Sequence, residues 1–99
     1  KAKGGILIVD GDESTRKTIR EALESRYDVI EAKHGFEAVR LADSLRPELI
    51  IVEVEISGIN GVDVCKRLKE TKHTRNIPVI LISAHTKKEK MKQTILALQ

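Results

Sequence analysis

Residues 49–68 read LIIVEVEISGINGVDVCKRL, and their pattern indicates the fold class. Its first four residues form a continuous apolar run, which is typical of a strand buried on both faces of a parallel sheet. A glycine-bounded turn over residues 58–61 follows, and Val64, Cys65 and Leu68 then share one face of a helix. The stretch therefore predicts a strand, a turn and an amphipathic helix, which together form one unit of an α/β fold.

Three more units of this kind accompany it. Apolar runs at 6–9 and 79–82 predict two further buried strands, and the alternating residues 27–32 predict an edge strand with one wetter face. Apolar stripes with helical spacing lie between or after these strands: Thr15, Ile19, Ala22 and Leu23; Phe36, Val39, Ala42 and Leu45; and Met91, Ile95 and Leu98. Alternating strands and helices predict a doubly wound parallel sheet with helices on both faces.

The composition limits what the chain can be. Its 99 residues, 40% hydrophobic and 33% charged, suffice for one domain and leave no room for a second. No apolar run approaches the about 20 residues needed to cross a bilayer, and the first residues lack the apolar core of a signal peptide. We therefore expect a cytoplasmic domain without a membrane partner. Cys65 is the only cysteine, and we expect it to pack as a small hydrophobe.

The net charge of +3 hides an acidic part and a basic part. Residues 1–65 hold nine Lys or Arg and thirteen Asp or Glu, whereas residues 66–99 hold nine Lys or Arg and two Asp or Glu. The last predicted helix carries a basic cluster, Lys87, Lys88, Lys90 and Lys92. A solvated helix face is the simpler interpretation, but such a cluster can also attract an acidic partner. With one Tyr, one Phe and no Trp for base stacking, we do not expect this domain to bind nucleic acid directly.

Acids and a hydroxyl follow the predicted strands. Asp10 and Asp12 come after the first strand, Glu53 and Glu55 after the third, and Ser83 after the fourth. Doubly wound sheets bind ligands beyond the carboxyl ends of their strands, and carboxylates suit a divalent cation beside a phosphoryl group. Each residue also has a structural interpretation: Asp12 could cap a helix, Ser83 could bond to its own backbone, and Glu55 could point into solvent.

These motifs resemble the receiver domains of two-component response regulators. ILIVDGDESTRKTI, residues 6–19, is similar to the family's first strand and acidic loop, and EAKHGFEAV, residues 31–39, to its second turn and helix. Residues 49–68 are similar to the phosphoacceptor strand and the following loop, and the resemblance continues through IPVILISA, residues 77–84. The resemblance implies a flavodoxin-like fold with strand order 2-1-3-4 that takes a phosphoryl group from a histidine kinase onto an aspartate, assisted by Mg²⁺.

The sequence departs from the family's pattern at the site. Gly11 stands where the second acid of a pair is usual, so that Asp12 would have to swing in to hold the metal. Glu53, one methylene longer than aspartate, occupies the phosphoacceptor position, and Glu55 occupies the position that contributes a backbone carbonyl to the metal. Ser83 retains the switch hydroxyl. The sequence stops before the family's fifth strand, with its essential lysine, and fifth helix, so we expect a C-terminally truncated receiver over residues 1–99.

These departures predict a pseudo-receiver that is poorly phosphorylated or not phosphorylated, binds partners and is not an enzyme. Phosphoryl transfer depends on positioning, so a nucleophile displaced by roughly 1 Å could lose about a hundredfold in rate. Expected partners are a histidine kinase or an output domain, bound through the basic last helix, and the one cofactor to consider is a weakly held Mg²⁺. The fourth strand would leave an apolar edge, which favours either a fragment of a longer protein or a homodimer through that edge.

Other functions stay open beside this one. One is a phosphorylation-competent receiver with a relocated metal site. Another is a haloacid dehalogenase-like phosphatase that uses Asp10 and Asp12 in its nucleophile loop, although no late acid pair follows Ser83. A flavin-binding protein shares the fold, but its first loop should cradle phosphate with backbone amides, and the acids of this loop would repel a phosphate.

Overall fold

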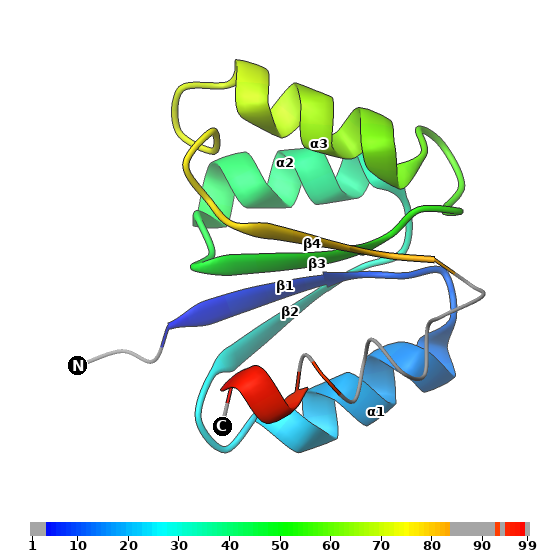
Figure 1. Ribbon diagram of the computed structural model, residues 1–99, viewed down its shortest axis with the longest axis vertical. Coiled ribbons are helices and arrows are strands. Elements are labelled where there is room, and N and C mark those ends of the chain that lie inside the picture. The colour runs from blue at the N-terminus through cyan, green and yellow to red at the C-terminus, as the bar shows by residue number, and fades with distance from the viewer. Residues whose placement is uncertain (1–3, 84–92, 94, 99) are drawn as a thin grey trace.

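The computed structural model describes residues 4–83, 93 and 95–98 (Figure 1). Along these residues the elements follow in the order β1 (Gly5–Val9), α1 (Glu13–Leu23), β2 (Asp28–Ala32), α2 (Gly35–Leu45), β3 (Leu49–Glu53), α3 (Gly61–Glu70) and β4 (Val79–Ile82). All strand pairs are parallel, and the sheet order is β2-β1-β3-β4. The structure confirms the predicted doubly wound, flavodoxin-like architecture, including the place of β2 at an edge.

Helices cover both faces of the sheet. α2 and α3 lie on one face, whereas α1 lies on the other, next to the helical residues 95–98 (Figure 1). Tyr27, just before β2, contacts this last segment, and its hydroxyl donates a hydrogen bond to the Leu98 carbonyl over 3.1 Å. Leu98 also packs against the core on the α1 side, as the predicted last stripe requires. Met91 and the basic cluster Lys87, Lys88, Lys90 and Lys92 lie outside the described residues.

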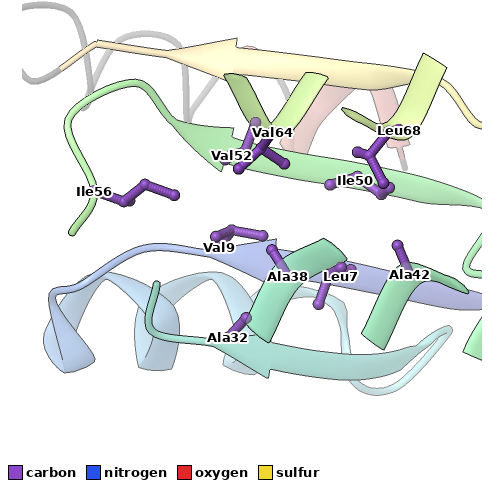
Figure 2. Packing of buried hydrophobic residues seen from close by; sticks show 10 residues of the cluster. All are labelled: Leu7, Val9, Ala32, Ala38, Ala42, Ile50, Val52, Ile56, Val64 and Leu68. Carbon is purple, nitrogen blue, oxygen red and sulfur yellow. The ribbon is translucent and has the colours of Figure 1, made fainter. Parts of the chain in front are cut away.

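Alternate strand residues point into two separate cores, one on each face of the sheet. The larger core, under α2 and α3, contains Leu7, Val9, Ala32, Ala38, Ala42, Ile50, Val52, Ile56, Val64 and Leu68 (Figure 2). The smaller core, under α1, contains Ile6, Ile8, Ile19, Leu23, Ile51 and Ile82. Because both faces of β1 and β3 are covered, these strands are apolar at successive positions, as their sequences predict. None of the described helices is long and apolar enough to cross a bilayer.

The predicted apolar face of α2 is wrong in part. Ala42 is buried and Val39 packs against the core, as predicted, but Phe36 and Leu45 are 52% and 53% exposed. Gly35 and Ala38 are buried on this helix as well. α2 begins directly against the loop that follows β3, since a Cβ added to Gly35 would lie 2.4 Å from the Ile59 backbone oxygen. A side chain at position 35 would collide with this loop, so glycine is required at the start of the helix.

Candidate functional site

The carboxyl ends of β1, β3 and β4 lie side by side at one edge of the sheet. Asp10 follows β1, Glu53 is the last residue of β3, and Ser83 follows β4. β3 lies between the other two strands, and Glu53 pairs directly with Ile82. The topology thus gathers three of the predicted site residues at adjacent strand ends, while their roles in phosphoryl chemistry stay predictions.

Asp10 is buried at this edge, with 4% of its surface exposed. Its backbone amide donates to the Ala32 carbonyl over 3.1 Å, which extends the pairing of β1 with β2 by one residue. Its Oδ1 accepts the amide N–H of Asp12 over 2.8 Å. The Asp10 side chain therefore shapes the loop that leads from β1 into α1.

Asp12 is the N-cap of α1. Its Oδ1 accepts from the Ser14 amide over 3.2 Å, and its Oδ2 accepts from the Thr15 hydroxyl over 2.6 Å. The capping interpretation that the sequence left open is therefore realised, and it satisfies an amide at the start of the helix. To reach a metal beside Asp10, the carboxylate would have to give up bonds that contribute about 1 kcal/mol each.

A buried arginine supports the same loop. Arg16 is 4% exposed, and its Nη1 donates to the Asp10 carbonyl over 2.6 Å. Its Nε donates to Glu31 Oε1 over 3.0 Å, and Arg20 Nη1 donates to Glu31 Oε2 over 2.6 Å. Glu31 of β2 thus bridges two arginines of α1, and one of them holds the end of β1.

The electrostatics of Glu31 follow from this bridge. Burial raises the pKa of its carboxyl, but the hydrogen bonds from Arg20 and Arg16 outweigh burial, and the pKa lies below its usual value. Sequence reasoning missed the network. A signal was present, because Arg16 shares the buried face of α1 with Ile19 and Leu23 at helical spacing.

The turn after β3 is fixed by close packing. The Gly61 amide donates to the Val54 carbonyl over 2.8 Å, and a Cβ added to Gly61 would lie 2.5 Å from the Glu53 carbonyl oxygen. Glycine is therefore required where α3 begins, directly against the end of β3. Glu53 is half-buried there, whereas Glu55 is exposed, in keeping with the solvent-facing interpretation of Glu55.

The residues around this edge can be tested against the requirements of Mg²⁺, which takes oxygen ligands in near-ideal octahedral geometry. Within the part of the chain that the structure describes, no three His, Cys, Asp or Glu side chains gather closely enough to hold a metal. The Asp12 carboxylate is directed to the cap of α1, and the adjacent position is Gly11. The described side chains do not fit a three-carboxylate magnesium site.

The sequence model of the response regulator receiver domain matches residues 6–98. The chain belongs to the receiver domain family. The polar-differentiation response regulator DivK of Brucella anthropi is 36% identical over 84 residues, which cover 84% of this chain and 68% of that relative. The family identification made from the motifs is confirmed, and it places this receiver domain in two-component signalling.

Solved receiver structures share the fold. The receiver domain of a signal transduction histidine kinase from Syntrophus aciditrophicus is 27% identical, with a TM-score of 0.79 over 96% of this chain and 89% of that chain. The chemotaxis response regulator CheY4 of Vibrio cholerae, at 22% identity, has a TM-score of 0.77 over 95% of this chain and 81% of that chain, which shows the fold alone. Receiver domains are generally signalling modules that interact with histidine kinases and output domains.

Proposed function

We propose that this receiver is a pseudo-receiver, a partner-binding module of two-component signalling that is poorly phosphorylated or not phosphorylated. The observation that carries the proposal is the place of Glu53. It ends β3, pairs with Ile82 and lies at the same edge as Asp10, where the family's pattern calls for an aspartate. Because phosphoryl transfer depends on positioning, one extra methylene at this point is enough to lower the rate about a hundredfold.

The acidic loop supports the proposal independently of Glu53. Gly11 supplies no carboxylate, and both oxygens of Asp12 accept hydrogen bonds at the start of α1. Arg16 holds the Asp10 carbonyl, so the backbone of the loop is tied to α1 as well. These hydrogen bonds would have to break before Asp12 could move to a relocated metal site, so they oppose that rearrangement.

In this proposal, Glu53 places a carboxylate at the position where the family carries a phosphoryl group. One carboxylate provides about one charge, whereas a phosphorylated side chain provides nearly two. The proposed partners are a histidine kinase or an output domain that recognises this partly activated surface, with the basic cluster Lys87, Lys88, Lys90 and Lys92 as the interaction face. Association of two copies through β4 belongs to the same proposal.

The test is the reaction of the protein with Mg²⁺ and acetyl phosphate, followed by intact-mass spectrometry. We expect no phosphoryl adduct on the unaltered chain. The double variant Glu53→Asp with Gly11→Asp restores the family's acids and should gain an adduct. Glu55→Asp shortens an exposed acid two residues away and serves as the matched control, which should stay unmodified. Ready phosphorylation of the unaltered chain would show a competent receiver and reject the proposal.

A further inference from the structure

One stripe of α3 lines a groove. Val62, Cys65, Lys66 and Lys69 follow one another at helical spacing and, with Glu70, line an open groove of about 420 Å³. Val62 is 41% exposed and Cys65 is half-buried. The apolar stems of the lysines add to the apolar surface between these two residues. We call this surface the α3 groove.

The α3 groove lies in a strongly basic part of the molecule. Residues 62–75 carry two acids and five basic side chains, and all five basic residues are exposed: Lys66, Arg67, Lys69, Lys72 and Arg75. Lys69 is held in place, because its Nζ donates to the Arg75 carbonyl over 3.1 Å and to the Ile77 carbonyl over 3.5 Å. A fixed positive charge therefore borders an apolar surface, and a complementary occupant needs both apolar and acidic side chains.

We propose that the α3 groove is a docking site for an acidic amphipathic helix of a partner protein. Apolar side chains of that helix would cover Val62 and Cys65, and its carboxylates would meet Lys66 and Lys69. Helices dock in grooves of this kind through apolar anchors at successive turns, and complementary charge sets their orientation and speeds their association. The inference rests on the proposed function in one respect, that the domain works by binding partners. The groove itself includes neither Glu53 nor the acidic loop.

A nucleic acid is the other occupant that positive charge could attract. None of the described residues that line the groove has an aromatic ring on which a base could stack. The Phe36 ring of α2 already lies against Arg67, whose guanidinium carbon is 5.5 Å from the ring centre. The apolar surface of Val62 and Cys65 contributes nothing to a phosphate backbone. An acidic helix uses both features of the groove, so it is the occupant that the surface favours.

Cys65 makes the proposal measurable, because it is the only cysteine and it lines the groove. Burial raises the pKa of its thiol, so its reaction with a thiol reagent such as DTNB is followed at about pH 8. The probe is a synthetic helical peptide with leucines along one stripe and glutamates elsewhere. The matched peptide carries lysine in place of every glutamate. The acidic peptide should slow the labelling of Cys65 about fivefold or more at saturation, and the basic peptide should not.

Two charge reversals on the full chain separate the groove from the net charge. Lys66→Glu should weaken binding of the acidic peptide about fivefold. Lys17→Glu makes the same change of charge at an exposed position of α1, on the other face of the sheet, and should change the affinity for the peptide less than about twofold. Circular dichroism establishes that each variant is folded, and Val62→Ser replaces Lys66→Glu if that variant unfolds.

Several results would overturn the α3 groove as an acidic-helix site. They are an absence of protection by the acidic peptide, equal protection by the basic peptide, equal protection by a single-stranded oligonucleotide, and equal weakening by the two charge reversals. None of these measurements involves phosphorylation. A failure here is therefore distinguishable from a failure of the pseudo-receiver proposal, which the acetyl phosphate reaction tests.

Discussion

The two outer strands of the sheet, β2 and β4, differ in how their edges are protected. β2 carries the charged residues Asp28 and Glu31 in five positions, and Glu31 is held by two arginines of α1. β4 reads VILI, carries no charge, and leaves Leu81 40% exposed. Among the described strands, neither has an outer neighbour. Charged side chains discourage pairing with another chain, so β2 is protected against association and β4 is suited to it.

The largest effect is expected at the arginine that secures the β2 side. Arg16→Ala leaves Glu31 without one of its two partners and removes a donor from the Asp10 carbonyl. Since Arg16 is buried, we expect a loss of about 3 kcal/mol in the free energy of unfolding, measured by urea denaturation. Arg20→Ala is the matched control: its side chain is 36% exposed, and it should cost clearly less. Equal losses of unfolding free energy in the two variants would show that the burial of Arg16 adds nothing to its contribution to stability.

A charge placed on β4 should weaken the association of two copies through this strand. If two copies pair through β4, Leu81→Lys weakens that dimer at least tenfold, or about 1.4 kcal/mol, because a lysine on each edge must be desolvated and repels its copy. Light scattering coupled to size-exclusion chromatography measures the dimer over a range of concentrations. Asp28→Lys places the same charge on the exposed first residue of β2 and should leave the dimer unchanged. A folded monomer at high concentration in the unaltered chain would reject pairing through β4.

The sequence predicted the sheet better than the surfaces of the helices. Continuous apolar runs identify β1 and β3 because strands covered on both faces bury every side chain, and this rule needs no knowledge of partners. Of the predicted face of α2, Ala42 and Val39 pack against the core, whereas Phe36 and Leu45 near the two ends of the helix are exposed. Which residues of a helix are covered depends on the elements that pack against it, and a local pattern does not contain them.

The sequence predicted which residues lie at the edge of the candidate site, and it predicted their contacts only in part. The order of strands places Asp10, Glu53 and Ser83 at one edge from topology alone. The Asp12 carboxylate could cap α1 or turn toward a metal. It caps the helix, because it accepts hydrogen bonds from the Ser14 amide and the Thr15 hydroxyl. The Arg16–Glu31 pair joins residues 15 positions apart, so the place of Arg16 on the buried face of α1 indicates that it needs a partner but does not identify Glu31 as that partner.

The smallest effect is expected when the pH is lowered and Glu31, the charged residue of β2 that pairs with two arginines, becomes protonated. The folded-state pKa of Glu31 is lowered, so its contribution to stability is present above the unfolded-state pKa of about 4.3 and is lost as the pH falls through the folded-state pKa. Glu31→Gln should lower the free energy of unfolding by roughly 1 kcal/mol near pH 7, since the pair is partly screened by solvent. The difference between the two proteins should then shrink below about pH 4. Urea denaturation at a series of pH values measures it, and a constant difference down to pH 2.5, roughly two units below the ordinary value, would show that the Glu31 charge adds nothing.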